Sequence, residues 1–164
     1  MAKGIQFWRV EKAIFAATAR TGEGARIAGG RWNSPGLPAI YCGQSLALSV
    51  LEILVHAVTP DERADPRVWF RLTLRADACR SVPPGRLPKG WDDPVIHPET
   101  VALGDAWLRG GRSAALRVPS AVIPGEWNYI LNPLHPQFRK LVRWSHPVAL
   151  KIDRRLVDGG AGIS

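Results

Sequence analysis

The chain has 164 residues, of which 46% are hydrophobic and 22% are charged. This composition is typical of one compact domain and argues against disorder, and no apolar run approaches the roughly 20 residues needed to span a bilayer. The segment at residues 1–9 lacks the apolar stretch of a signal peptide. We therefore expect a cytoplasmic protein that does not associate with membranes.

Basic residues outnumber acidic ones, which gives the chain a net charge of +8. Most of them are arginine, whose planar guanidinium suits phosphate and carboxylate groups. A nucleic acid, a phosphorylated small molecule and an acidic protein would all fit this charge. The basic residues are dispersed from Lys3 to Arg155, with nothing denser than pairs such as Arg139-Lys140. Because a dedicated nucleic-acid-binding arm is more concentrated, we do not expect direct nucleic-acid binding.

The cysteines and histidines give no metal-binding pattern. Cys42 and Cys79 are far apart, so each is expected to be a small apolar side chain without a disulfide partner. The four histidines form no His-Glu-x-x-His motif and no Cys/His group: His56, His97, His135 and His146. The spacing therefore predicts no metal site.

The first half of the chain predicts two strands, a long loop and a helix. A strand is expected at residues 5–10, followed by a glycine- and proline-rich loop at residues 18–38. A short apolar strand follows at residues 39–42. Ser45 is then placed to cap a helix that continues to about residue 58, where a Thr-Pro pair ends it.

This predicted helix is almost entirely apolar, and its polar residues share one face because they are three or four positions apart. They are Ser45, Ser49, Glu52 and His56. A carboxylate in such a helix must face solvent or have partners, since an unpaired buried charge is unfavourable. Two alternatives stay open for Glu52: an exposed side chain, or a member of a polar stripe that faces a pocket.

The second half alternates strands with a further helix. An alternating strand is expected at residues 67–76, and a Pro/Gly-rich connection follows at 81–94. A helix at 99–109 ends at Gly110-Gly111, and the next strand, at 113–123, is interrupted by Pro119-Ser120. Asn132-Pro133 predicts a turn, and a strand pair is expected at 138–152. Many strands with few helices predict a single-domain α+β fold with mixed β-sheets.

Three further residues are candidates for a site. Arg31 follows two glycines that allow close backbone approach to a ligand, although a surface arginine is the simpler alternative. Tyr41, in an apolar strand, is expected either to line a pocket or to pack in the core. Ser120 needs a hydrogen-bond partner, which a ligand or the local backbone would supply. His56, Asn128 and Asn132 are weaker candidates, because a lone Asn or His near a turn is usually structural.

Five motifs, in this order, resemble the RES-domain family, the toxins of bacterial toxin–antitoxin modules. The motifs are Gly29-Gly30-Arg31-Trp32-Asn33, Ala39-Ile40-Tyr41-Cys42, Leu51-Glu52-Ile53-Leu54-Val55-His56, Arg117-Val118-Pro119-Ser120 and Asn128-Tyr129-Ile130-Leu131-Asn132-Pro133. The similarity extends from about residue 7 to residue 152. Five ordered motifs are more specific than any one of them.

The resemblance implies a fold related to the ADP-ribosyltransferase toxins. We expect one such domain at residues 1–157, and the residues at the end of the chain predict a flexible tail at 158–164. It also implies an enzyme that consumes NAD as its substrate. Such an enzyme cleaves the bond between nicotinamide and ribose and passes ADP-ribose to a protein, to water or to phosphate. The sequence does not choose among these acceptors.

Carried over residue by residue, the resemblance makes Glu52, Tyr41 and Arg31 the catalytic residues. It makes Arg31, Tyr41, Ser120 and His56 the residues that bind NAD. Glu52 would stabilise the positive charge that develops on the ribose, Arg31 would hold the pyrophosphate, and Tyr41 would pack against nicotinamide or ribose.

The resemblance further implies a cognate antitoxin with a DNA-binding domain, in a toxin–antitoxin hetero-oligomer, and a protein target of ADP-ribosylation. The alternative function is a basic nucleic-acid-binding or RNA-cleaving toxin. That alternative fits the charge and the seven tryptophans, but the chain lacks a helix-turn-helix pattern or an aromatic RNA-binding motif. A purely structural protein is the third alternative.

Overall fold

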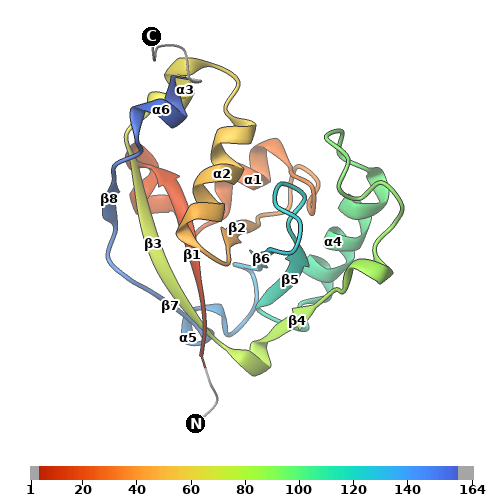
Figure 1. Cartoon of the computed structure of the whole chain (residues 1–164). Helices are drawn as coiled ribbons and strands as arrows, with labels where there is room; N and C mark the ends of the chain where they lie inside the picture. Colours follow the sequence, from red (N-terminus) through yellow and green to blue (C-terminus); the bar gives the residue numbers. More distant parts are fainter. Residues whose placement is uncertain (1–3, 159–164) are drawn as a thin grey trace.

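The computed structural model describes residues 4–158, which fold around one twisted sheet (Figure 1). The strands are β1 (Gly4–Lys12), β2 (Ile40–Gly43), β3 (Arg67–Arg75), β4 (Cys79–Ser81), β5 (Ala115–Pro119), β6 (Trp127–Leu131), β7 (Val142–Trp144) and β8 (Val148–Leu150). The eight-stranded sheet has the order β4-β5-β6-β2-β1-β3-β7, and β8 also pairs with β3. The β4–β5 pair is parallel and the other pairs are antiparallel, so the sheet is mixed.

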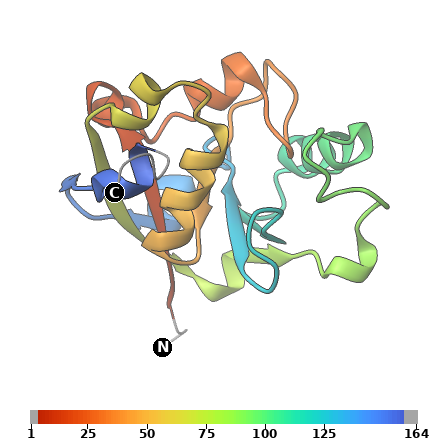
Figure 2. The same ribbon diagram turned by 45° about the horizontal axis from the view of Figure 1, so that its top comes forward.

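Helices and short 3-10 turns cover this sheet. The helices are α1 (Glu23–Ala28), α2 (Leu46–His56), α3 (Pro60–Ala64), α4 (Pro98–Gly110), α5 (Phe138–Leu141) and α6 (Arg154–Val157), and the 3-10 turns are η1 (Ala13–Thr18), η2 (Ala76–Ala78) and η3 (Pro84–Arg86). Figure 2 shows α4 on one side of the molecule and α3, α6 and β3 on the other. The α+β class and the single domain are as predicted.

The pleat of the central strands sends successive side chains into two separate apolar clusters. On one face, Phe7 of β1 stacks on Tyr129 of β6, with 4.8 Å between the ring centroids. On the other face, Ile130 of β6 packs with Leu116 of β5 and Leu108 of α4. Helix α4 therefore covers the second face, which is also the face that carries Tyr41.

The structure confirms the elements with clear local signals. Strands β1 and β2 lie where they were predicted, and Ser45 caps α2 by accepting a hydrogen bond from the amide of Leu48 at 3.1 Å. Strand β3 alternates as expected, although its first residue, Arg67, is buried. Helix α4 ends where the glycine pair predicted, because Gly111 adopts a left-handed conformation with φ of 58°.

Four helices occur where the sequence predicted none, namely α1, α3, α5 and α6, and the first two have clear local causes. Helix α1 lies inside the predicted loop, between Gly22 and Gly29, and Arg26 pairs with Glu23 at 2.6 Å. Both glycines have positive φ, so here they mark the ends of a helix. Helix α2 already ends at His56, and the Thr-Pro pair that was predicted to end it instead begins α3, because Thr59 and Glu62 form a capping box.

The strand predictions in the second half need four corrections. Strand β4 precedes the predicted connection, and β5 already ends at Pro119. Strand β6 was missed, because a central strand with five residues covered on both faces shows no alternation. The expected strand pair begins with helix α5, and β7 and β8 each pair with the long strand β3. Of the predicted tail, residues 159–164 lie outside the described residues.

Both cysteines are free thiols. Cys42 is buried in the core as predicted, whereas Cys79 is only partly buried. Burial raises the pKa of Cys42 to about 12 and that of Cys79 to about 11, so both thiols stay protonated at neutral pH. No helix in residues 4–158 has the length and apolarity to cross a membrane.

Candidate active site

The carboxylate of Glu52, in the middle of α2, is held by two side chains from the sheet. Ser120 Oγ donates to Glu52 Oε1 at 3.0 Å, and Asn128 Nδ2 donates to the same oxygen at 2.6 Å. Glu52 Oε2 has no hydrogen-bond partner within residues 4–158. Of the two alternatives for Glu52, the structure therefore excludes a carboxylate that only solvent surrounds.

Ser120 lies directly after β5, and only 4% of its surface is exposed. Its oxygen accepts hydrogen bonds from the amides of Val122 at 3.1 Å and Ile123 at 3.0 Å. Those two bonds occupy the lone pairs of the hydroxyl, so its proton points at Glu52. The local backbone and Glu52 together supply the partners that the sequence analysis sought for this serine.

Asn128 was a weaker candidate from the sequence, and its contact with Glu52 makes it a member of the candidate site. It lies in β6, opposite Gly43 of β2 on one side and Val118 of β5 on the other. Gly43 lets α2 approach the sheet, since a Cβ there would lie 2.7 Å from Ser49 Oγ. The motif that begins at Asn128-Tyr129 contained this residue, but its contact with Glu52 could be inferred only from strand β6 and the register of its pairing.

Tyr41 holds the loop that carries Arg31. Its hydroxyl accepts from the amide of Trp32 at 3.0 Å and donates to Asn33 Oδ1 at 2.6 Å. Gly30 makes this contact feasible, because a Cβ there would lie 2.6 Å from the hydroxyl oxygen. Burial raises the pKa of Tyr41, so the hydroxyl stays protonated and acts as a structural donor rather than as a base.

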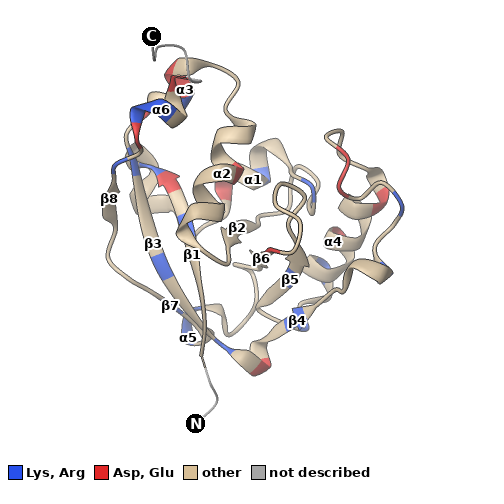
Figure 3. Cartoon of the chain, viewed as in Figure 1, with Lys and Arg blue, Asp and Glu red and all other residues tan. Residues whose placement is uncertain are grey.

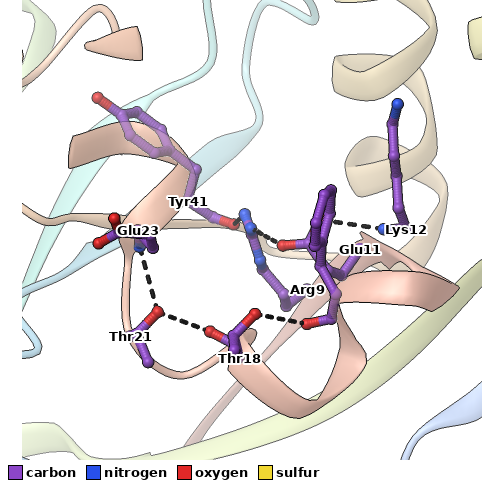
Figure 4. A network of polar contacts seen from close by, with 8 residues as sticks. Arg9, Glu11, Lys12, Thr18, Thr21, Glu23 and Tyr41 are labelled. Carbon is purple, nitrogen blue, oxygen red and sulfur yellow. Dashed lines mark hydrogen bonds and ion pairs between the residues drawn. The ribbon is translucent and has the colours of Figure 1, made fainter. Parts of the chain in front are cut away.

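The backbone of Tyr41 is also fixed from the neighbouring strand (Figure 4). Arg9 Nη1 in β1 donates to the carbonyl of Tyr41 at 3.0 Å, and the same guanidinium pairs with Glu11. Strands β1 and β2 share the register pair Trp8 and Gly43. Arg9 thus extends the contact between these strands beside the candidate site.

Arg31 is half-buried and projects towards the segment before α4. Its Nη1 donates to the carbonyl of Trp91, and its Nη2 donates to the carbonyl of Asp93 at 2.9 Å. Arg31 immediately precedes Trp32, whose amide donates to the Tyr41 hydroxyl, so the loop that carries Arg31 is attached to Tyr41. Two of the five N–H groups of the guanidinium are used in these bonds.

The polar residues that were predicted to share one face of α2 lie in different environments. Ser49 is buried and donates to the carbonyl of Trp8 at 2.9 Å, so it connects α2 to β1. His56 is exposed at the end of the helix, where its Nδ1 lies 2.6 Å from the backbone carbonyl of Glu52. The structure brings Glu52, Ser120 and Asn128 into contact, and it places His56 one turn away from them.

The sheet brings the residues around Glu52 close to Tyr41 and the loop that carries Arg31. Tyr41 lies opposite Ile130, and Asn128 is two residues from Ile130 on the same strand, so the side chains of Tyr41 and Asn128 share one face. Diagonal neighbours of this kind are roughly 7 Å apart. Glu52, which binds Asn128, and the Arg31 loop, which binds Tyr41, therefore lie over the same face of the sheet.

A hollow of about 410 Å³ lies elsewhere, at the C-terminal end of α4. Apolar side chains such as Leu37, Leu108 and Leu134 line it, and Arg109 is its one ionisable residue. It offers neither a carboxylate nor a nucleophile. The chemistry therefore favours the region of Glu52 as the active site.

We expect Tyr41→Phe to lower the free energy of unfolding by about 1–3 kcal/mol, because two buried polar groups lose their partner. The amide of Trp32 and Asn33 Oδ1 would both be left without the hydroxyl. Urea unfolding followed by tryptophan fluorescence measures the change. An unchanged unfolding midpoint would contradict the structural role of the hydroxyl.

The fold and the site define a class of protein. A half-buried carboxylate with one fixed oxygen and one free oxygen lies over a mixed sheet, beside a loop that carries an arginine. These features define an α+β enzyme with a positioned carboxylate and an arginine over one face of its sheet.

The chain belongs to the RES domain family, whose model matches residues 6–153. It is 35% identical over 150 residues to "Toxin Res" of Photorhabdus laumondii, covering 92% of this chain and 96% of that protein. It is 34% identical over 148 residues to the "Prs ADP-ribosylating toxin" of Sphingobium sp., covering 84% and 91%. A chain in the crystal structure of the M. tuberculosis MbcT–MbcA toxin–antitoxin complex has the same fold, with a TM-score of 0.71 at 20% identity over 97% of this chain and 90% of that one.

Within the described residues, no group of three or more His, Cys, Asp or Glu side chains could hold a metal ion.

Proposed function

We propose that this RES-domain protein is an NAD-consuming toxin that cleaves the bond between nicotinamide and ribose and transfers ADP-ribose to an acceptor. The observation that carries the proposal is the carboxylate of Glu52, which has Oε1 bound by Ser120 and Asn128 and Oε2 free for a substrate. Relatives named as a Res toxin and as an ADP-ribosylating toxin support the same function.

One carboxylate is sufficient for this chemistry. When the bond between the ribose carbon and the nicotinamide nitrogen breaks, the electron pair stays on the cationic ring, which leaves as neutral nicotinamide. Unlike an ordinary glycosidase, the site therefore needs no acid to protonate the leaving group. The ribose becomes positively charged, and the free oxygen of Glu52 stabilises that charge most strongly in the transition state. The acceptor then attacks the ribose carbon and releases its proton to water.

Ser120 and Asn128 are positioning residues in this scheme, because they reach the substrate only through Glu52. Their two hydrogen bonds to Oε1 fix the rotation of the carboxylate, so that Oε2 points away from both donors. Holding a catalytic group in one orientation lowers the entropy lost on reaching the transition state. This assigns Ser120 a role beside Glu52 rather than on the substrate.

Arg31 binds the pyrophosphate of NAD in this proposal. Two backbone carbonyls hold its guanidinium in place, and three N–H groups remain for phosphate oxygens. Tyr41 supports the Arg31 loop through its hydroxyl, and its ring forms part of the wall beside the ribose. His56, exposed at the end of α2, contributes to the rim of the site.

The partner of this toxin is a cognate antitoxin that carries a DNA-binding domain, in a toxin–antitoxin hetero-oligomer. The toxin–antitoxin complex that shares this fold supports that partner. The net charge of +8 suits an acidic antitoxin segment over the site. The proposed location is the cytoplasm, and the acceptor is a protein, water or phosphate.

The function is tested by incubating the purified chain with NAD and following the release of nicotinamide. ADP-ribose attached to a cellular protein, detected by mass spectrometry, would identify a transferase, whereas free ADP-ribose or its phosphorylated product would identify water or phosphate as the acceptor. Salt-sensitive RNA binding or RNA cleavage without nicotinamide release would instead favour the nucleic-acid alternative.

We expect Arg31→Gln to raise the KM for NAD about tenfold or more and to change kcat less, because a charge-assisted contact with the pyrophosphate is lost. Initial rates of nicotinamide release at varied NAD concentration measure both constants. Arg112→Gln is the matched control, since Arg112 is exposed just after α4. Equal KM values in the two variants would contradict phosphate binding by Arg31.

A further inference from the structure

A second basic site lies away from Glu52, in a crevice of about 330 Å³ between α3, the start of β3 and α6. Figure 3 shows basic residues on α6 next to α3, and Figures 1 and 2 both place this pair of helices apart from α4. The charged residues that line the crevice are Arg63, Asp65, Arg67, Lys151, Arg154 and Asp158. None of the residues assigned to the NAD site lines it.

Arg67 is a buried cation that forms no ion pair within the described part of the chain, residues 4–158. Only 8% of its surface is exposed, and its one hydrogen bond within residues 4–158 runs from Nη2 to the carbonyl of Glu62 at 2.7 Å. Its Nε is buried without a partner in the same residues. Burying a charge without a counterion is unfavourable, so this guanidinium is suited to an anion in the crevice.

Arg63, which also lines the crevice, likewise has a buried nitrogen without a partner. It lies on α3, its Nε is buried without a partner, and its side chain makes no hydrogen bond or ion pair among the described residues. Buried polar atoms in folded proteins normally have a hydrogen-bond partner. Two buried Nε atoms without one, on arginines that line the same crevice, need an explanation.

The acidic residues of the crevice form no ion pair or hydrogen bond with these two arginines within residues 4–158, although the charge of Arg67 helps to lower the pKa of Asp65. Asp65 pairs with Lys12 at 2.7 Å, and its pKa is lowered mainly by that hydrogen bond. Asp158 lies 4.0 Å from Arg154. Each carboxylate is thus directed to another cation, and the exposed Lys151 adds one more positive charge to the rim.

We propose that this crevice binds a phosphoryl group, either as free phosphate or as the phosphate of a nucleotide. A phosphate has oxygens in several directions and a charge near −2, so it can accept from Arg63 on α3 and from Arg67 on β3 at once. A carboxylate has one charge and two oxygens in one plane, so it can accept less well from both guanidinium groups at once. The bound anion connects α3 to β3 and stabilises the folded chain by mass action.

Equilibrium dialysis of the full chain against radiolabelled inorganic phosphate, at constant ionic strength, tests the proposal. Arg31→Gln is the background for all measurements, so that the NAD site contributes little. In this background we expect Arg63→Gln to weaken phosphate binding about tenfold, because one charge-assisted contact is lost. Arg139→Gln removes the same charge from an exposed position on α5 and should leave the affinity unchanged.

Arg63 carries the test because it is only partly buried, whereas substitution of the buried Arg67 would also disturb folding. Lys151→Gln, at the exposed rim, is the second variant and should weaken binding by a smaller factor. Competition by AMP would identify nucleotide phosphates as the source of the group, and failure of AMP to compete would identify the free ion. Equal affinities in Arg63→Gln and Arg139→Gln, or no phosphate binding in the background protein, would overturn the proposal.

Discussion

Glu52→Gln is expected to lower kcat for nicotinamide release about a hundredfold to a thousandfold while leaving the fold intact. Glutamine has the shape of glutamate, and its Oε1 can still accept from Ser120 and Asn128. The substitution replaces only the free, charged oxygen with a neutral NH₂ group. The loss therefore reports the charge that faces the ribose, and single-turnover rates at saturating NAD measure it.

Two further variants separate charge from position. Ser120→Ala and Asn128→Ala each remove one hydrogen bond to Glu52 Oε1 and keep the negative charge. They should lower kcat by smaller factors than Glu52→Gln and change the KM for NAD little. Circular dichroism and thermal unfolding confirm that each variant is folded. A folded Glu52→Gln protein with the wild-type rate would disprove the catalytic role.

Gly104→Ala is expected to lower the free energy of unfolding by about 3 kcal/mol or more. An added Cβ at Gly104 would lie 1.8 Å from the carbonyl oxygen of Trp32 and 2.5 Å from its carbonyl carbon. Both contacts are with backbone, so α4 and the loop would have to separate. For a chain of this length the change corresponds to a Tm lower by about 6–12 °C, measured by differential scanning calorimetry.

Gly110→Ala is the matched control in the same helix. Its added Cβ would meet nothing within 4 Å, and its φ is not in the left-handed region. Alanine favours the helical conformation over glycine, so this variant should be more stable by about 0.5–1 kcal/mol. Equal destabilisation by both substitutions would show that the contact between α4 and Trp32 is not the cause.

The Gly104 substitution also has a consequence for the site. Trp32 adjoins Arg31, and the amide of Trp32 binds the hydroxyl of Tyr41. Asp105, next to Gly104, binds the amide of Ser34 at 2.8 Å and its hydroxyl at 2.6 Å. Helix α4 therefore positions the Arg31 loop, and we expect Gly104→Ala to raise the KM for NAD as well as to lower stability.

Local signals predicted the elements that have strong ends or a clear period. Ser45 marked the start of α2, the glycine pair marked the end of α4, and alternation marked β3. The same approach failed for α1 and β6. At α1 the glycines suggested a loop, although they lie at the two ends of a short helix. Strand β6 is buried on both faces, so its sequence has no polar side that would indicate a strand.

The sequence by itself determined the family, through five motifs in order, and named Arg31, Tyr41, Glu52 and Ser120 as site candidates. It did not determine how they act together. The contact between Glu52 and Asn128 joins residues 76 positions apart, and it depends on the register of β6 against β2 and on the close approach of α2 at Gly43. Only the tertiary structure decides such contacts, because pairing and packing between distant segments bring those side chains together. No local pattern of residues encodes those distances.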